Sequence, residues 1–283
     1  MTGIIDIGSN TVRLVMYDNG KQVFNKGLNS EIIKDTNDGI LSREGTEKLC
    51  SQLLLLKEQA EGNSIFAFAT YAMRILKNKE EVKSIIFDKT GIDVEILSGE
   101  EEAEYDFIGL KSTLNDEESG AGVDLGGGSG QIMFFENGKI TFSSSYPIGC
   151  RRIKNKLVKG RFPDSDEKEN IKKYVKEQLC GISEKRFGKI YMMGGTAKTA
   201  AKLYSFLNGN ENIDVIKTDK LDNLASFISE TPQPIMKNIL KNRFDNIVVG
   251  IIIMEQIARK MNASEIHIKK CGVRDGYLIK KDL

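Results

Sequence analysis

Short apolar runs separated by glycine turns occur twice along the chain in the same order. Residues 4–21 read IIDIGSNTVRLVMYDNGK, and residues 122–140 read GVDLGGGSGQIMFFENGKI. A shift equal to the separation of Asp6 and Asp124 superposes the two stretches without a gap. Each stretch closes on Asn-Gly, which predicts a two-residue hairpin turn because both turn residues need positive φ. We therefore predict strand, glycine turn, strand, Asn-Gly turn and strand in each copy, and hence a duplicated domain.

The rest of the chain alternates helical spacing with short buried runs. Strands are predicted at 64–70, 93–97, 190–193 and 265–270. Helices are predicted over the ranges 42–62, 82–91, 166–179, 194–204, 243–261 and 271–281. Three further helices are predicted from their first residues: one capped by Thr70, one that begins at the Ser98/Glu101 capping box, and one capped by Thr218. This alternation indicates an α/β fold with mixed sheets.

The polar, glycine-bearing stretch 114–122 directly precedes the second copy and marks the expected domain boundary. We predict an N-terminal domain at 1–117 and a C-terminal domain at 118–283, with a terminal helix at about 275–283 that can pack back on the first domain. At 283 residues, the chain is long enough for two domains of ordinary size.

Composition narrows the class of protein. Hydrophobic residues make up 40% and charged residues 29% of the chain, and the net charge is +1, so no global charge favours nucleic acid or a membrane surface. The longest apolar run is too short to span a bilayer, and the N-terminus has no signal-peptide pattern. The chain has no C-x-x-C pair, so the cysteines are interpreted as reduced thiols of a cytoplasmic protein: Cys50, Cys150, Cys180 and Cys271. The single histidine, His267, is interpreted as a strand residue in IHI rather than a catalyst.

An aspartate directly before a glycine turn suits a phosphate bound together with a metal ion. Glycine lets backbone N–H groups converge on an anion, and the carboxylate can hold a divalent cation that offsets the phosphate charge. A lone D-x-G-G-G is more often only a tight turn, but two copies and a third glycine turn at 194–196 favour phosphate binding. A dinucleotide fingerprint fits badly because residues 131–135 read as strand, and a P-loop fits badly because Ala197 precedes Lys198.

With those residues placed, the chain resembles the exopolyphosphatase and guanosine pentaphosphate phosphohydrolase family, in its short form, within the actin-like ATPase superfamily. The similarity covers nearly the whole chain, in the motifs DIGSNTVRL (6–14), ATYAMR (69–74), LSGEEEAEYDFIGL (97–110), VDLGGGSGQ (123–131), YPIGCRR (146–152), MGGTAKTAAKL (193–203), RFDNIVVG (243–250) and CGVRDGYL (271–278).

The resemblance implies two actin-like (ribonuclease H-like) α/β domains with the active site in a cleft between them. It implies release of terminal phosphate from inorganic polyphosphate or of the 5′ γ-phosphate from guanosine pentaphosphate, with Mg²⁺ or Mn²⁺, and a place in the stringent response. The general base falls on Glu102, Arg74 faces the cleft, and Asp124 and Asp6 are the metal positions. The phosphate contacts fall on Ser9, Asn10, Thr11, Gly126, Gly127, Gly128, Ser129, Gly194, Gly195 and Thr196.

Long polyanionic substrates also suggest a role for clustered basic residues. The run 151–161 carries six basic residues and no acidic one, and although most such runs are solvated faces, Arg151, Arg152 and Lys198 are candidate polyanion contacts. A homodimer is one possible assembly, and neither nucleic acid nor membrane is expected as a partner.

The chain departs from the family pattern at two places. Relatives usually carry Thr-Glu after the serine of the second turn, where this chain has Gly130 and Gln131, and many carry a basic residue where it has Glu104. Because this chain lacks the glutamate carboxylate at position 131, an alternative function stays open: a non-catalytic sensor on the same fold that binds polyphosphate or an alarmone. An ATP-dependent kinase is less favoured because such chains need a larger nucleotide-binding lobe. The hydrolase interpretation requires Asp6 and Asp124 to face one another across a shared crevice, with Glu102 within reach.

Overall fold

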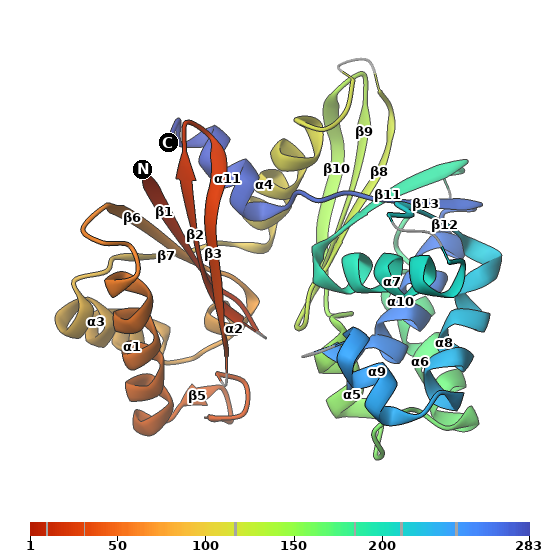
Figure 1. Cartoon of the computed structure of the whole chain (residues 1–283), viewed down its shortest axis with the longest axis horizontal. Helices are drawn as coiled ribbons and strands as arrows, with labels where there is room; N and C mark the ends of the chain where they lie inside the picture. Colours follow the sequence, from red (N-terminus) through yellow and green to blue (C-terminus); the bar gives the residue numbers. More distant parts are fainter. Residues whose placement is uncertain (10, 31, 116–117, 184, 210–211, 241–242) are drawn as a thin grey trace. The chain divides into compact units, whose positions relative to one another are not determined.

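The computed structural model describes residues 1–9, 11–30, 32–115, 118–183, 185–209, 212–240 and 243–283. The chain divides into two compact units: unit 1 comprises Met1–Tyr105 and Arg274–Leu283, and unit 2 comprises Asp106–Val273. The division falls within helix α4 (Gly99–Lys111), earlier in the chain than the polar stretch 114–122. The C-terminal segment groups with unit 1 (Figure 1).

Unit 1 is built on a five-stranded mixed sheet in the order β3-β2-β1-β6-β7 (Figure 1). Strands β1, β2 and β3 are antiparallel neighbours, whereas β1, β6 and β7 run parallel. The strands are β1 (Thr2–Ile7), β2 (Thr11–Asp18), β3 (Lys21–Asn29), β6 (Ser64–Ala69) and β7 (Val94–Ile96), and a separate short pair is formed by β4 (Thr36–Asn37) and β5 (Ile40–Leu41).

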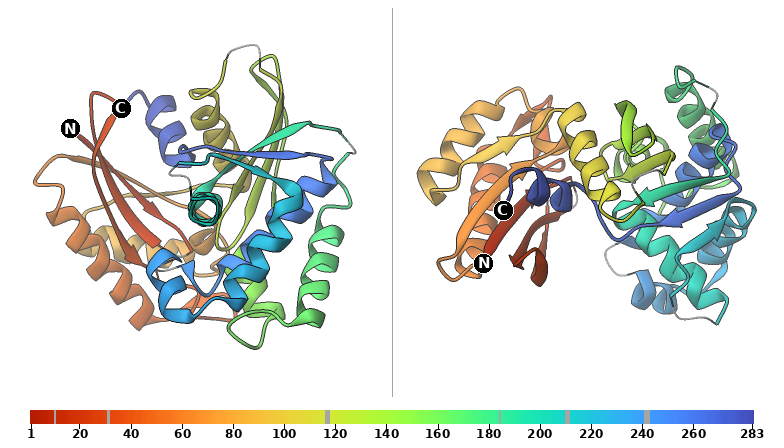
Figure 2. Two further views of the ribbon diagram at one scale, coloured as in Figure 1. Left: turned by 45° about the vertical axis from the view of Figure 1, so that its right-hand side comes forward. Right: turned by 90° about the horizontal axis from the view of Figure 1, so that it is seen from above.

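Helices cover both faces of this sheet. Helices α1 (Arg43–Glu58) and α3 (Lys79–Thr90) pack on one face, where Ile5, Leu53 and Ile86 belong to one buried core (Figure 2). On the other face, Phe68 contacts Tyr277 of α11 (Val273–Lys280), with ring centroids 4.9 Å apart. The C-terminal helix therefore completes the core of unit 1.

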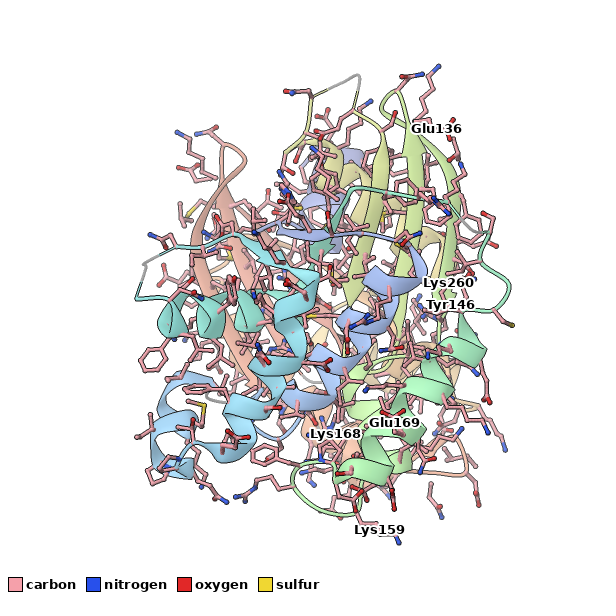
Figure 3. All side chains as sticks on the ribbon, turned by 90° about the vertical axis from the view of Figure 1, so that its right-hand side faces the viewer. Glu136, Tyr146, Lys159, Lys168, Glu169 and Lys260 are labelled. Atoms are coloured by element: carbon pink, nitrogen blue, oxygen red, sulfur yellow. The ribbon has the colours of Figure 1, made fainter. Side chains whose placement is uncertain are left out.

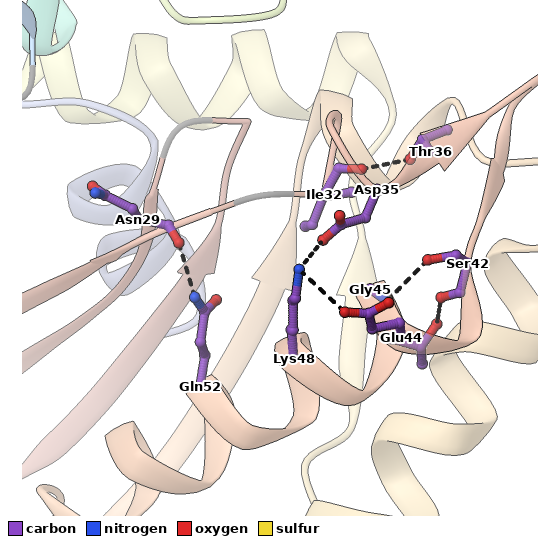
Figure 4. Close-up of polar contacts among 10 residues, drawn as sticks. Asn29, Ile32, Asp35, Thr36, Ser42, Glu44, Gly45, Lys48 and Gln52 are labelled. Atoms are coloured by element: carbon purple, nitrogen blue, oxygen red, sulfur yellow. Dashed lines mark hydrogen bonds and ion pairs between the residues drawn. The ribbon is translucent and has the colours of Figure 1, made fainter.

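The start of α1 is fixed by side chains from the preceding loop (Figure 4). Ser42 is the N-cap, and its Oγ accepts a hydrogen bond from the Gly45 N–H at 3.0 Å, as the sequence predicts. Lys48 Nζ lies 3.3 Å from Asp35 and 3.9 Å from Glu44, so one ammonium group joins the loop to the first turn.

Unit 2 contains a six-stranded mixed sheet in the order β10-β9-β8-β11-β13-β12. Its long helix α10 (Ile247–Lys260) is buried along Ile247–Ala258 and packs against four helices of this unit (Figure 2). These are α5 (Cys150–Leu157), α6 (Ser165–Gln178), α7 (Gly194–Leu207) and α8 (Leu221–Glu230), with α9 (Gln233–Leu240) beside α7. The strands are β8 (Gly120–Leu125), β9 (Gly130–Glu136), β10 (Lys139–Tyr146), β11 (Lys189–Met193), β12 (Val215–Lys217) and β13 (Glu265–Ile268).

The predicted duplication is confirmed in the topology. The strand order β3-β2-β1-β6-β7 in the sheet of unit 1 corresponds to the order β10-β9-β8-β11-β13 in the sheet of unit 2, where β12 is an additional edge strand. Both Asn-Gly turns have left-handed backbones, with φ of 48° and 73° at Asn19 and Gly20 and 49° and 66° at Asn137 and Gly138. The capping box also forms, since the Ser98 and Glu101 backbone N–H groups donate to each other's side chains.

Three local predictions need correction. Thr70 stands at the N-cap of α2 (Tyr71–Arg74), but its side chain makes no capping hydrogen bond. Thr218 opens a 3₁₀ turn, η1 (Thr218–Lys220), and its hydroxyl donates to the Ala263 carbonyl rather than capping α8. The helix predicted from 243 begins at Ile247. In the case of Thr218, a partner distant in sequence takes the side chain that would otherwise cap the helix.

No helix among the described residues is both long enough and apolar enough to cross a bilayer.

Candidate active site

In each unit, the predicted site residues gather at the carboxyl ends of parallel strands. In unit 1, the glycine turn follows β1, α2 follows β6 and α4 follows β7; in unit 2, the second glycine turn follows β8 and α7 follows β11. Parallel strands place their carboxyl ends at one edge of a sheet, which is where open α/β sheets bind ligands. Each unit therefore contributes its own set of candidate groups, and the shared crevice stays a prediction.

The predicted catalytic residues of unit 1 form an ion pair. Arg74 Nη1 donates to Glu102 Oε2 at 2.8 Å and to the Leu97 carbonyl oxygen at 2.9 Å. The Glu102 side chain is 9% exposed and the Arg74 side chain 20%. The capping box at Ser98 fixes the first turn of α4, and that turn carries Glu102. A nearly buried carboxylate is thus held in one orientation by a guanidinium that is itself anchored to the backbone.

The first glycine turn holds Asp6 beside a different arginine. Arg274 Nη1, at the start of α11, donates to Asp6 Oδ2 at 2.6 Å. Burial raises the pKa of the Asp6 carboxyl above its ordinary value, while Arg274 and Arg13 oppose that rise. Arg274 was not predicted as a site residue, although it lies in the CGVRDGYL motif.

Backbone hydrogen bonding closes this turn. The Gly8 N–H donates to the Thr11 carbonyl at 3.0 Å, with Ser9 buried and Thr11 partly buried. Asn10, predicted as a phosphate contact, lies outside the described residues. The phosphate contacts at Ser9, Asn10 and Thr11 stay predictions.

The second glycine turn is fixed from two sides. The Gly126 N–H donates to the Ser129 carbonyl at 3.0 Å, which closes the turn, and the Arg151 and Arg152 N–H groups each donate to the Gly127 carbonyl at 2.9 Å. The start of α5 is packed against the turn so closely that a Cβ on Gly149 would lie 2.3 Å from the Gly128 backbone. The turn is therefore a rigid frame before any ligand binds.

Asp124 lies against the third glycine turn. It is paired with Met193 in the parallel β8–β11 ladder, and the next residue, Gly194, has φ of 84°. A Cβ on Gly194 would lie 2.1 Å from Asp124 Oδ1, so any other residue here would displace that carboxylate and strain the backbone. The structure thus brings Asp124 next to the predicted turn at 194–196.

Arg243 joins the same place from a distant segment. Its Nη1 lies 3.4 Å from Thr196 Oγ1, and a Cβ on Gly195 would lie 1.9 Å from its Nη2. The guanidinium therefore covers the first turn of α7, where helix N–H groups already favour an anion. Arg243 was not predicted as a site residue, although it lies in the RFDNIVVG motif.

Gln131, at the departure from the family pattern, faces Asp124 directly. The two residues pair across the antiparallel β8–β9 ladder. Gln131 is 1% exposed, and its Nε2 donates to Ser129 Oγ at 3.0 Å and to Ser145 Oγ at 3.2 Å. A neutral amide, hydrogen-bonded to two hydroxyl groups, thus stands where the resemblance predicts a carboxylate.

The basic run 151–161 is partly used within the fold. Lys156 Nζ lies 4.3 Å from the centre of the Tyr174 ring, and Arg161 pairs with Asp245 at 3.2 Å. Lys159 projects at the outer end of the segment (Figure 3). Arg151 and Arg152 lie at the start of α5 beside the second turn, and Lys198 lies one turn into α7.

The carboxylates beside the glycine turns are compatible with a cation that takes most of its ligands from substrate and water. Within the described ranges, no group of three or more His, Cys, Asp or Glu side chains is arranged to hold a metal ion. Mg²⁺ typically takes one or two carboxylates together with water and substrate phosphates, so Asp124 beside a glycine turn is compatible with it. Asp6 would have to bind a cation next to the Arg274 guanidinium. Glu104, the second departure, pairs with Lys280 at 2.8 Å.

Comparison with known proteins identifies the class. Residues 22–283 match the Ppx/GppA phosphatase family, and the chain belongs to that family. This membership confirms an enzyme of the phosphoanhydride hydrolase type and the predicted resemblance.

Individual relatives agree with this assignment. The chain is 22% identical to exopolyphosphatase 1 of Mycobacterium tuberculosis H37Rv, over 99% of this chain and 87% of that protein. It is 28% identical to a bifunctional 3-dehydroquinate synthase/phosphatase of Fusobacterium nucleatum, over 89% of this chain but only 42% of that protein, so it spans less than half of that relative.

A solved structure, an exopolyphosphatase from Cytophaga hutchinsonii, superposes with a TM-score of 0.87 at 20% identity, covering 100% of this chain and 98% of that one. At this identity the likeness concerns the fold, and it confirms the predicted actin-like α/β class.

Proposed function

We propose that the chain is a cytoplasmic, divalent-metal-dependent hydrolase that releases terminal phosphate from inorganic polyphosphate, the 5′ γ-phosphate from guanosine pentaphosphate, or both. The observation that carries the proposal is the ion pair between the nearly buried Glu102 and the partly buried Arg74 in a chain of the Ppx/GppA phosphatase family. The exopolyphosphatases among its relatives favour polyphosphate.

Unit 1 supplies the base in this proposal. Glu102 aligns a water molecule and takes its proton as the water oxygen attacks the terminal phosphorus, and the bridging oxygen of the phosphoanhydride leaves with the shortened chain. Arg74 orients the carboxylate through Nη1, and in this proposal its remaining N–H groups stabilise equatorial phosphate oxygens. No covalent intermediate is required.

Unit 2 supplies the anion frame. The turn at 126–129 and the start of α7 present backbone N–H groups, and Arg243 and Thr196 add side-chain donors at that helix terminus. Asp124 would hold Mg²⁺ or Mn²⁺ beside the phosphates, where the cation offsets the charge that develops on the oxygens. Because these groups are preorganised, substrate binding needs little rearrangement of the turn.

A second candidate, a non-catalytic polyphosphate or alarmone sensor, is favoured by Gln131 alone. The position opposite Asp124 carries no charge, which weakens attraction for a cation relative to a carboxylate there. The Arg74–Glu102 pair and the first turn of α7, with Arg243 beside it, do not depend on that residue. The hydrolase therefore remains the function that the arrangement supports better.

A side-by-side assay tests both functions. Purified protein with Mg²⁺ or Mn²⁺ is given long-chain polyphosphate or guanosine pentaphosphate, and free phosphate is measured over time. We expect phosphate release that stops when the metal is chelated and resumes when it is restored. Micromolar binding of either ligand without phosphate release above buffer would favour the sensor, and transfer from ATP to an acceptor would favour a kinase.

A further inference from the structure

A groove of about 400 Å³ lies beside the second half of α7 in unit 2. Its nearly buried lining residues are Ala201 and Ser205 of α7 and Ile268 of β13. Ser205 Oγ accepts a hydrogen bond from the Ile213 N–H at 2.9 Å, which ties the segment before β12 to the helix. The groove is thus lined by α7, by β13 and by the loop before β12, and its size lies in the usual range for ligand sites.

The lining of this groove is strongly basic. Lys198, Lys202 and Lys270 line it, and Asp214, 3.7 Å from Lys270, is the one acidic residue among the described residues of the lining. These described residues together carry a formal charge of about +2, whereas the whole chain carries +1. Such a local excess in a concave surface raises the local concentration of anions.

The lysines lead away from the third glycine turn. Lys198, Lys202 and Phe206 are spaced by four residues and share one face of α7. The helix begins at Gly194, so at 1.5 Å per residue Lys198 and Lys202 lie about 6 and 12 Å along its axis from that turn. This row of lysines runs from the third glycine turn at 194–196, which Arg243 covers, to the groove.

We propose that the groove is a remote anion subsite, which binds phosphate groups of an inorganic polyphosphate chain several units away from the phosphate that is released. The inference rests on the proposed function. Each phosphate of the chain carries charge, and lysines bind it as mobile point charges without strict geometry. Long chains reach the groove and short chains do not, so the groove makes the protein prefer long chains.

The same lysines would attract the phosphates of a nucleotide, whose base could then stack on Phe206, which is 55% exposed. Both ligands share phosphate chemistry. The continuous row of lysines from the glycine turn favours the inorganic chain, and the test separates the two sources.

The test compares two triple variants of the full chain. Lys198→Ala, Lys202→Ala and Lys270→Ala are combined in the groove variant. Lys168→Ala, Lys176→Ala and Lys260→Ala are combined in the control, which removes the same charge from α6 and α10 of the same unit (Lys168 and Lys260 are labelled in Figure 3). Binding of labelled long-chain polyphosphate, tripolyphosphate and a guanosine nucleotide is measured at low and high salt in the Glu102→Gln background, where turnover does not deplete the ligand.

We expect the groove variant to raise the Kd for long-chain polyphosphate about tenfold at low salt and less at high salt. The Kd for tripolyphosphate should change by less than about twofold in the groove variant. The control variant should bind every ligand with the same Kd as the parent. Lys202→Glu, which reverses one charge, should reproduce part of the effect, and both triple variants should keep the parental unfolding temperature.

Unchanged affinity for long chains in the groove variant would overturn the subsite, as would an equal loss for tripolyphosphate. Loss confined to the guanosine nucleotide would also overturn it and assign the groove to a nucleotide. Because binding is measured without turnover, absence of phosphate release by the wild type would defeat the proposed hydrolase and leave this result standing.

Discussion

The two glycine turns share a backbone plan and differ in the charges around their aspartates. In unit 1, Asp6 pairs across the strand ladder with Arg13 and accepts a hydrogen bond from Arg274. In unit 2, Asp124 pairs across the ladder with Gln131, the residue that occupies the same place in the repeat as Arg13. Across the strand ladder, therefore, Asp6 faces a cationic side chain and Asp124 faces a neutral amide.

This difference divides the chemistry between the units. Arginines beside Asp6 offset its charge permanently, because a guanidinium does not lose its proton in proteins. The amide paired with Asp124 carries no charge, and in the function proposed above a bound cation would supply the positive charge there. Under that proposal the same turn serves as a fixed electrostatic frame in one copy and as a metal-dependent one in the other, and the following predictions sharpen or break that contrast.

The largest effect is expected at Glu102, the proposed base of unit 1. Glu102→Gln should lower turnover about 10²–10⁴-fold because the amide cannot take the proton of the attacking water. Binding of polyphosphate should remain, since the anion frame lies in other residues. The matched control is Glu104→Gln, two residues later, whose carboxylate pairs with Lys280. Turnover near the wild-type value in Glu102→Gln would reject the base assignment.

The next effect is expected at the third glycine turn of unit 2. In Gly194→Ala, the new Cβ would meet Asp124 Oδ1 and the residue would keep φ of 84°, so we expect about tenfold weaker polyphosphate binding and a lower unfolding temperature. Gly188→Ala is the control, because a Cβ there meets nothing within 4 Å. Equal behaviour of the two variants in both measurements would show that Asp124 is not constrained by this turn.

A smaller effect tests the contrast itself. Gln131→Glu places a second carboxylate opposite Asp124, where repulsion between them is relieved by a cation. We expect the Mg²⁺ concentration for half-maximal activity to fall several-fold, and the unfolding temperature to rise with Mg²⁺ more than in the wild type. Gln131→Met, neutral and of similar length, should give neither change. Identical Mg²⁺ titrations for Gln131→Glu and the wild type would place this position away from the metal.

The smallest effect concerns stability away from both turns. The hydrogen bond from Lys189 Nζ, at 2.7 Å, and that from Tyr191 lower the pKa of Glu118. A lowered pKa contributes stability at neutral pH that is lost as pH falls through the folded-state pKa. Glu118→Gln should therefore reduce stability by about 1 kcal/mol at pH 7 and by less in acid, measured as urea unfolding at several pH values. A deficit that is the same at every pH would contradict an ionic origin.

Much of the backbone structure around the two glycine turns could be predicted from the sequence, because it depends on interactions between residues that are close in the chain. The two Asn-Gly hairpins and the Ser98/Glu101 capping box each need only a few neighbouring residues to satisfy their dihedrals and hydrogen bonds. Thr218 shows the limit of such reasoning, since a local capping pattern lost its hydroxyl to Ala263, which is distant in sequence.

The sequence by itself determined the duplication, the hairpins and the residue types at each turn, since these follow from local backbone preferences and hydrophobic pattern. Only the tertiary structure decided which charged groups meet. Glu102 is held by Arg74, Asp6 by Arg274, and the first turn of α7 is covered by Arg243. Each of these contacts joins segments far apart in the chain, and their meeting depends on sheet register and helix packing, which no local pattern specifies.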